Sequence, residues 1–278
     1  MWLELLRKGR LRHLFSNGEL QALDEAIDQT IPLAPRTIVI EPVIRPRFLH
    51  YIVQGSLARY TDDYFGDRRL VAVGMAGDFI DLEGFAIERY DYSVGTLEHT
   101  ILARIPHERL AQSISLFPRV RMALWCATSL DGATHREWIF RLGRLRGEAR
   151  IASLICEIVE RAKLVDLYDG KTVPIPLLQS EFAQACGMSS VHANRCFRTL
   201  RERGALCCTG SGQIDIIDEA ALKRIGQFDD DFLYAEGVST NEISNDRPVS
   251  SYRPFESTGE LAGRITMRQS HRLRGVET

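Results

Sequence analysis

The chain has few of the features that mark membrane, secreted or metal-binding proteins. Its 278 residues contain no run of 18 apolar residues, and the N-terminal stretch MWLELLRKGRLRH lacks the apolar core of a signal peptide. The six cysteines include no C-x-x-C pair and no spacing suited to zinc or an iron–sulfur cluster. We therefore expect a cytoplasmic protein with no membrane contact, no metal and no cofactor, whose cysteines are buried thiols.

The motifs of common enzymes are also missing. The sequence has no Gly-rich phosphate loop, no G-x-S-x-G and no H-E-x-x-H, and its adjacent carboxylates (Asp62-Asp63 and Asp229–Asp231) are typical of a turn and a solvated tail. We expect no catalytic activity. The net charge of −2 excludes a polycation, so any contact with nucleic acid must come from a local basic patch.

The N-terminal part has the pattern of short antiparallel strands. After a capping box, Ser16-x-x-Glu19, and a short helical pattern, the chain turns from Ile31 to runs rich in Val, Ile, Tyr and Phe, separated by Gly, Pro and Asp. The expected strands are 37–40, 48–53, 56–61, 70–73, 94–97 and 100–105. Their regular spacing predicts an antiparallel barrel or jelly roll, with a hairpin tip in Asp62–Asp67.

A long helix is expected to follow from about Phe117. Its seam recurs at alternating four- and three-residue steps, which is typical of a coiled-coil contact, although packing onto the protein's own β domain would give the same pattern. The seam residues are Val120, Leu124, Ala127, Asp131, Thr134, Trp138 and Leu142. Gly143 and Gly147 are expected to end this helix, and a second amphipathic helix is expected over 148–164.

The stretch 178–206 carries the clearest functional signal. Phe182, Ala183 and Cys186 form an apolar stripe, Gly187 permits a left-handed turn, and Ser189 is placed to cap a helix that runs from about 190 to 203. Four arginines fall within 195–203, and a predicted hairpin (206–209 and 213–217, around Gly210-Ser211-Gly212) follows directly. This is the layout of a winged helix-turn-helix, in which the second helix enters the major groove of DNA.

Beyond Phe228 the apolar periodicity ends. Acidic residues dominate 229–242 and arginines dominate 264–274, so we expect a flexible charged tail. The expected organisation is therefore a β-roll with an N-terminal helix (1–116), a dimerisation helix (117–143), a winged helix-turn-helix (144–228) and a tail (229–278). The fold class is α+β.

The order of these parts resembles the Crp–Fnr superfamily of bacterial transcription regulators. In the β-roll the resemblance is carried by Gly55, Gly66 and Gly77-Asp78-Phe79. In the DNA-binding part it is carried by Glu181, Gly187, Ser189, Val191-His192, Asn194-Arg195 and Leu200-Arg201. The resemblance implies a homodimer on a near-palindromic operator, with RNA polymerase as a further partner if the protein is an activator. The alternative function is a ligand-binding regulatory module that acts through protein–protein contacts.

The resemblance also implies roles for individual residues. Ser190, Val191 and Arg195 fall at positions of base contacts, while Gln179, Ser180 and Arg198 fall at positions of contacts to phosphate or neighbouring bases. Physically, Arg195 can pair with guanine in two hydrogen bonds, and Arg198 and Arg201 are better placed for phosphate. Asn194 is assigned equally to adenine contact or to packing. His192 is assigned to packing or phosphate contact, and Ser189 completes the expected DNA-binding set.

The ligand cassette departs from the cyclic-nucleotide binders of this family. They carry an adjacent Arg-Ser or Arg-Thr that holds the cyclic phosphate, and 77–97 has no such pair. The expected pocket residues are Gly77, Asp78, Asp81, Glu83, Arg89 and Ser93. Arg89 is the only cation in this segment and Asp91 lies beside it, so we expect that cyclic AMP is not the effector. The residues do not identify a different effector.

Overall fold

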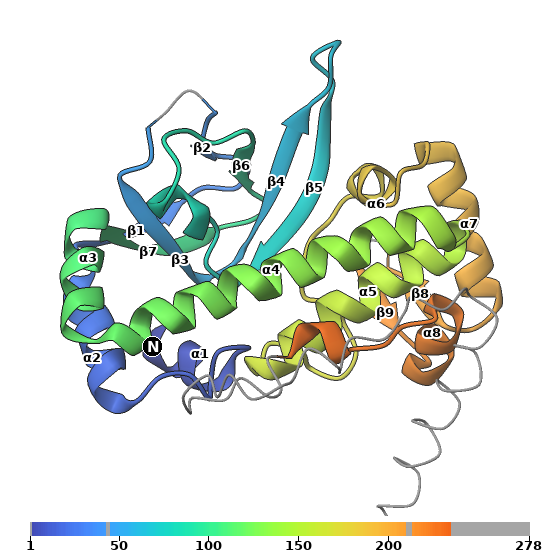
Figure 1. Cartoon of the computed structure of the whole chain (residues 1–278). Coiled ribbons are helices and arrows are strands. Elements are labelled where there is room, and N and C mark those ends of the chain that lie inside the picture. The colour runs from blue at the N-terminus through green and yellow to red at the C-terminus, as the bar shows by residue number, and fades with distance from the viewer. Residues whose placement is uncertain (1, 43–44, 210–212, 235–278) are drawn as a thin grey trace, which may run out of the picture. The chain divides into compact units, whose positions relative to one another are not determined.

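The computed structural model describes residues 2–42, 45–209 and 213–234. Two antiparallel sheets build a β-roll in the N-terminal part (Figure 1). The first sheet has the order β1-β7-β3, and the second has the order β2-β6-β4-β5. Their bounds are Gln29–Leu33 (β1), Ile38–Ile40 (β2), Phe48–Gln54 (β3), Ser56–Asp62 (β4), Arg68–Met75 (β5), Ser93–Thr96 (β6) and Thr100–Pro106 (β7).

The six expected strands are confirmed, as is the hairpin turn between strands 56–61 and 70–73. Gly55, Gly66 and Gly77 all have positive φ, and Gly66 lies in the β4–β5 hairpin turn, as predicted. β1 was not predicted from the sequence, because Pro32 and Pro35 interrupt the pattern of strand-forming residues there. The helix α3 (His107–Leu116), which follows β7, was not predicted either.

Helices cover the outer face of the β1-β7-β3 sheet. They are α1 (Trp2–Lys8), α2 (Asn17–Ala26) and α3, and the capping box of α2 is formed, with the backbone N–H of Ser16 donating to the carboxylate of Glu19 at 2.6 Å. Apolar side chains of these helices share one core with Leu49, Tyr51 and Ile105 of the sheet. The inner face of the sheet belongs to a separate core inside the roll. A short 3-10 helix, η1 (Leu82–Phe85), follows Gly77.

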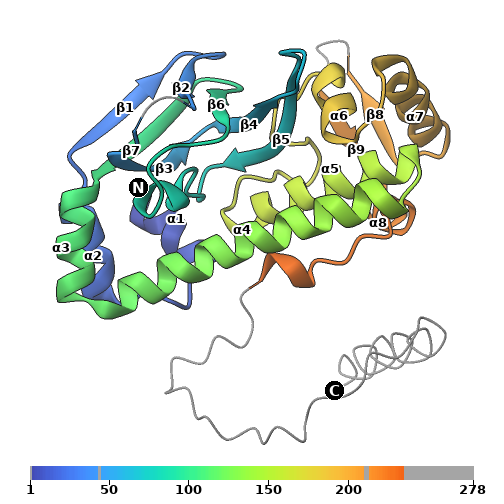
Figure 2. The same ribbon diagram turned by 45° about the horizontal axis from the view of Figure 1, so that its top comes forward.

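The long helix α4 (Pro118–Arg144) runs along the roll from α3 towards the C-terminal helices (Figures 1 and 2). Four of the seven expected seam residues face the protein's own interior: Val120, Leu124, Thr134 and Trp138 are all at most 8% exposed, whereas Ala127 and Asp131 are partly exposed and Leu142 is 38% exposed. A burial of this depth leaves these four no surface for a second chain, so packing within the protein accounts for them.

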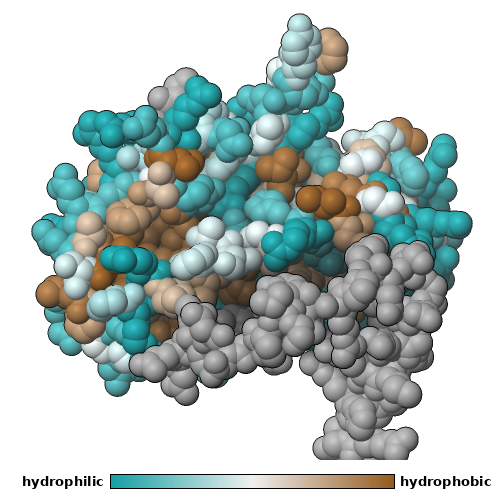
Figure 3. Space-filling view, in the orientation of Figure 1, coloured by the Kyte–Doolittle hydropathy of each residue, from teal (hydrophilic) through white to brown (hydrophobic). Residues whose placement is uncertain are grey.

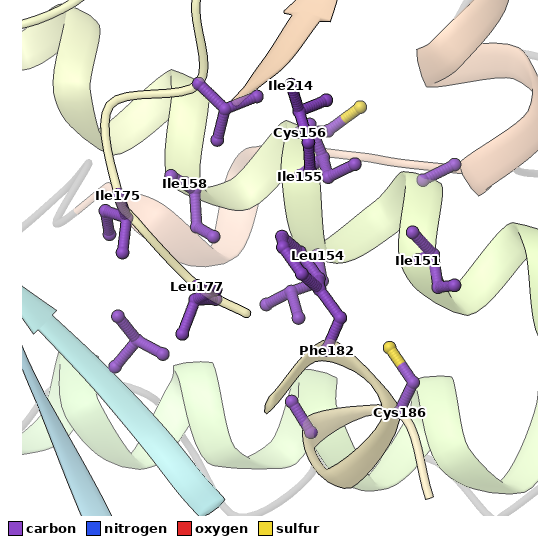
Figure 4. Packing of buried hydrophobic residues seen from close by; sticks show 14 of the residues in the cluster. Ile151, Leu154, Ile155, Cys156, Ile158, Ile175, Leu177, Phe182, Cys186 and Ile214 are labelled. Atoms are coloured by element: carbon purple, nitrogen blue, oxygen red, sulfur yellow. The ribbon is translucent and has the colours of Figure 1, made fainter. Parts of the chain in front are cut away.

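The C-terminal part forms a winged helix-turn-helix. It contains α5 (Gly147–Leu164), α6 (Gln179–Ala185), α7 (Ser190–Glu202), β8 (Leu206–Cys208), β9 (Ile214–Ile216) and α8 (Glu219–Gly226). Figure 4 shows Leu154 and Ile151 of α5 facing Phe182 of α6 and Cys186 at the C-terminal cap of α6, and these side chains are all fully buried. The two strands of the wing are antiparallel, as expected, while its tip at Gly210-Ser211-Gly212 lies outside the described residues.

The first residues of the expected tail are docked, which corrects the boundary at 228/229. A 3-10 helix, η2 (Asp231–Leu233), packs against α4, and Leu233 is fully buried. Arg10 donates to the carbonyl of Leu233 at 3.1 Å, and the guanidinium of Arg12 lies 5.9 Å from the ring centre of Tyr234. The sequence pattern missed this contact because a single turn is too short to show periodicity. The rest of the expected tail, 235–278, lies outside the described residues.

We therefore predict that Leu233→Ala destabilises the protein. Emptying a fully buried leucine site costs about 2–5 kcal/mol in free energy of unfolding. The matched control is Leu116→Ala, because Leu116 is 74% exposed and its loss should change the free energy by less than about 0.5 kcal/mol. Denaturant unfolding of both variants measures the difference, and equal stabilities would show that η2 contributes nothing.

Candidate nucleic-acid interface

The turn between α6 and α7 is built by two local devices. Gly187 adopts φ +59°, which is the left-handed conformation that ends α6. The hydroxyl of Ser189 then accepts a hydrogen bond from the backbone N–H of His192 at 3.2 Å, which caps α7. Both features agree with the expectation from sequence, and together they fix the angle at which α7 leaves α6.

Packing divides α7 into two faces. Ala193, Cys196, Phe197 and Leu200 are buried, and the ring of Phe197 meets that of Phe182 edge to face at 5.4 Å between ring centres. The other face is open to solvent. All ten residues expected to contact DNA are exposed: Gln179, Ser180, Ser189, Ser190, Val191, His192, Asn194, Arg195, Arg198 and Arg201. Val191, an apolar residue at the start of α7, is 63% exposed.

The exposed face of α7 carries free positive charge. Arg195, Arg198 and Arg201 form no ion pair with any residue that the structure describes. Arg203 is different, because its guanidinium lies 3.8 Å from the carboxylate of Glu148. Three unpaired guanidiniums within two turns of one helix give a local positive potential that the net charge of the chain conceals.

The start of α5 fixes α7 through a close approach at Gly147. A Cβ atom built on Gly147 would lie 2.6 Å from both Cys196 Sγ and His192 Nε2. A side chain at Gly147 would force the side chains of Cys196 and His192 to shift, so this glycine has a packing function. The expected helix-ending role is corrected, because Gly143 lies within α4 and Gly147 is the first residue of α5. Part of the surface of His192 is therefore turned to α5, which agrees with the packing role that the sequence allowed for it.

The link between α4 and α5 is short and clamped. α4 ends at Arg144, α5 begins at Gly147, and Arg150 of α5 reaches back across the link. Its guanidinium donates to the carbonyl of Leu142 at 2.7 Å, that of Leu145 at 2.9 Å and that of Cys186 at 3.1 Å. One side chain thus satisfies carbonyls at the end of α4, in the link and at the end of α6.

The β-roll touches the helix-turn-helix at α6. Arg36, in the loop before β2, forms an ion pair with Glu181, whose carboxylate also accepts the backbone N–H of Leu178 at 2.8 Å. The side chain of Gln184 accepts the backbone N–H of Leu70, in β5, at 3.2 Å. The contacts between the roll and α6 could not be predicted from the sequence, because more than 100 residues separate Arg36 from Glu181 and Leu70 from Gln184.

A buried ion network joins α4, α5 and the ligand cassette. The carboxylate of Glu157 accepts from Trp138 Nε1 at 2.9 Å, from Arg141 at 2.8 Å and from Arg161 at 3.2 Å. Arg161 also pairs with Asp78 and donates to the carbonyl of Val73 at 3.0 Å. Glu157, Arg141 and Arg161 are nearly inaccessible to solvent, so each charge depends on the others for compensation.

The expected pocket residues do not form one site. Gly77, Asp78 and Glu83 line a small cavity of about 60 Å³ between the roll and α4. Asp81 is fully buried elsewhere, where it accepts from His50 Nδ1 at 2.6 Å and from the backbone N–H of His50 at 2.8 Å. Arg89 is exposed and Ser93 is buried, and neither lines this cavity.

The cations of this cavity come from distant parts of the sequence, and two of the three are paired with carboxylates. Arg10, Arg59 and Arg161 line it, none of them in the cassette 77–97. Arg59 pairs with Asp131 at 2.6 Å and donates to the carbonyl of Ile80. Burial acts to raise the pKa of Asp131, but Arg59 outweighs it and holds the pKa below its ordinary value. Arg10 donates to the carbonyl of Leu130 and to the hydroxyl of Thr134.

Together, a β-roll, a long connecting helix and a winged helix-turn-helix with an exposed basic helix define a DNA-binding regulator. The Crp-like helix-turn-helix domain family matches residues 149–225. The transcriptional activator FnrL of Cereibacter sphaeroides is 28% identical over 183 residues, which cover 63% of this chain and 71% of the relative. The transcriptional activator FnrA of Stutzerimonas stutzeri is 20% identical over 204 residues, or 73% and 83% of the two chains.

The solved structure of FixK2 from Bradyrhizobium japonicum has the same fold. It is 17% identical, covers 71% of this chain and 96% of its own, and superposes with a TM-score of 0.64. These comparisons support a transcription regulator of the Crp–Fnr type with a DNA-binding helix-turn-helix. Within the residues that the structure describes, no helix is both long and apolar enough to span a membrane.

Proposed function

We propose that the protein acts as a homodimer whose two α7 helices enter successive major grooves of a near-palindromic operator. The observation that carries this proposal is the exposed face of α7 with its three unpaired arginines. In a helix-turn-helix the N-terminal residues of the second helix meet base edges, and half-sites lie about one helical turn apart. We assign the protein no catalytic activity. FnrL and FnrA are named as transcriptional activators. If this regulator is also an activator, RNA polymerase is its second macromolecular partner.

The position of each side chain on α7 suggests its role. Arg195 lies in the second turn and is assigned to a bidentate contact with guanine, while Ser190 and Val191 at the helix start meet neighbouring bases. Arg198 and Arg201 lie further along the helix and are assigned to phosphates. Ser189, His192, Gln179 and Ser180 flank this face. Ser189 is assigned to a phosphate contact, His192 to phosphate contact or packing, and Gln179 and Ser180 to phosphate or neighbouring bases. Asn194 is assigned to adenine contact or packing.

A second stripe on α4 is better placed than the expected seam to join two copies. Trp125 is 67% exposed and Ile139 is 71% exposed, and both face away from the roll. They belong to a series with alternating three- and four-residue steps, which is the spacing of a coiled-coil seam: Met122, Trp125, Ser129, Gly132, Arg136, Ile139 and Gly143. None of these residues is buried, and Figure 3 shows brown patches among the hydrophilic surface of the face on which α4 lies.

The cavity beside α4 argues against cyclic AMP as the effector. Its volume of about 60 Å³ is far below the ~300–1,000 Å³ of typical small-molecule sites. Arg59 and Arg161 in its wall are already paired with Asp131 and Asp78. Arg10 is engaged by the carbonyl of Leu130 and the hydroxyl of Thr134, so a cyclic phosphate would have to displace existing partners from these cations. We propose that operator binding does not require a cyclic nucleotide.

We predict that Arg195→Ala and Arg201→Ala have different effects on DNA binding. Loss of Arg195 should cost about 1–3 kcal/mol on the operator and little on random DNA, because only base contacts discriminate. Loss of Arg201 should weaken both and reduce the salt slope by about 1. The measurement is a salt titration with an operator selected from random DNA. Unchanged operator selectivity in Arg195→Ala would refute the assignment.

We predict that Trp125→Glu yields monomers. Paired charges at an apolar contact are costly to bury, and one substitution enters a two-fold interface twice. The matched control is Phe65→Glu, since Phe65 is 87% exposed at the tip of the β4–β5 hairpin, away from α4. Light scattering should give a monomer for Trp125→Glu and a dimer for the control. A dimer in both variants would show that this stripe is not the interface.

We predict no coupling between cyclic nucleotides and operator affinity. Titration calorimetry with cyclic AMP and with cyclic GMP should show no micromolar binding, and operator affinity should be the same with and without either nucleotide. Micromolar binding accompanied by tighter operator binding would overturn the prediction, and Arg59→Gln would then test whether the cavity beside α4 opens.

A further inference from the structure

A larger cavity lies inside the β-roll, away from the cavity beside α4. Its volume is about 550 Å³, within the ~300–1,000 Å³ range of small-molecule sites. β1 and β2 are the edge strands of their sheets, and the cavity is lined by residues of both. The β2 strand is only three residues long and its pairing with β6 is irregular, so it leaves this end of the roll incompletely filled.

One wall of this cavity is a single face of the first sheet. Side chains two residues apart point to the same side of a strand, and each of the three strands supplies one such pair: Ile31 and Leu33 from β1, Leu102 and Arg104 from β7, and Phe48 and His50 from β3. Ile31 pairs with Leu102 across the sheet, and Arg104 pairs with His50. The pair Ile31 and Leu102 is thus apolar, and the pair Arg104 and His50 beside it carries nitrogen donors.

The opposite wall is apolar throughout. It consists of Ile38, Val39 and Ile40 of β2, and the core inside the roll continues from it, with Ile40 and Leu102 buried. Ile38 remains 42% exposed although it lies beside the cavity. The lining also includes Tyr90, whose hydroxyl donates to Asp81 at 3.3 Å, so the β2 side favours an apolar group.

Charge in the lining is of one sign. Three arginines line the cavity and no carboxylate does: Arg45, Arg47 and Arg104. Arg104 is held by Asp28 through two hydrogen bonds of 3.0 and 2.8 Å and lies 4.2 Å from the ring centre of Phe48. His50 is held by Asp81. Arg45 and Arg47 are exposed, and neither side chain has an ion pair or a hydrogen bond with a described residue.

We propose that this cavity binds an amphipathic anion, with a medium-length alkyl chain between the two sheets and a carboxylate or phosphate head at Arg45 and Arg47. Apolar walls favour the chain, and two unpaired guanidiniums favour a negative head over a neutral or positive one. The proposal goes beyond the DNA-binding function and does not depend on it. Because the site lies between strands of the β-roll, it offers a place for an amphipathic effector, which the cavity beside α4 is too small to accommodate.

The test is titration calorimetry of the full chain, without DNA, against four decyl probes below their micelle concentrations. Sodium decanoate or decyl phosphate should bind in a saturable one-to-one manner, 1-decanol should bind more weakly, and decylamine should not bind. The double variant Arg45→Gln/Arg47→Gln should weaken anion binding by more than about tenfold and leave 1-decanol unchanged, since each charged hydrogen bond that is lost contributes at least about that factor.

The matched control is Arg68→Gln/Arg69→Gln, which removes the same charge from the β4–β5 hairpin outside the cavity and should leave binding unchanged. Ile38→Trp should narrow the cavity and weaken binding of every probe without touching a cation, and thermal unfolding checks that the variants are folded. Three results would each overturn the proposal: no saturable binding of either anion, binding of decylamine as tight as that of decanoate, or equal losses in both arginine double variants.

Discussion

The arrangement of the protein depends on one buried carboxylate. Glu157 lies on α5 and neutralises Arg141 of α4 and Arg161 of its own helix, while Arg161 continues to Asp78 in the ligand cassette. Removing one partner from such a network leaves an uncompensated buried charge, which costs several kcal/mol. The network therefore fixes three parts of the chain relative to one another: the end of the long helix, the first helix of the DNA-binding part and the loop after β5.

The sequence predicted the parts whose signals are local. The cap at Ser189, the left-handed Gly187, the hairpin turn at Gly66 and the capping box at Ser16 all depend on neighbouring residues, and all are confirmed. Six strands were found from alternation and punctuation. The winged helix-turn-helix was found for the same reason, since its apolar stripe, turn and hairpin follow one another directly.

What the sequence could not predict depends on contacts between distant residues. The cations beside α4 come from positions 10, 59 and 161, so a search of the cassette 77–97 for a cation could find only Arg89, which is exposed. The seam of α4 shows the same limit. The helix has two apolar stripes, and periodicity alone does not tell which of them the β-roll covers. The roll covers the stripe of Val120 and Trp138 and leaves Trp125 and Ile139 in solvent.

The clamp formed by Arg150 has a consequence for how a signal could travel. Because its guanidinium ties together the carbonyls of Leu142, Leu145 and Cys186, α4, α5 and α6 meet in one hydrogen-bonded junction. These hydrogen bonds restrain rotation of the helix-turn-helix about the link between α4 and α5. The helix-turn-helix must follow the helix that carries it, so a small rotation of α4 about its own axis would be converted into a lateral displacement of α7 along the DNA. The helix α4, rather than the link between α4 and α5, is then the element that an effector or a second subunit would have to move.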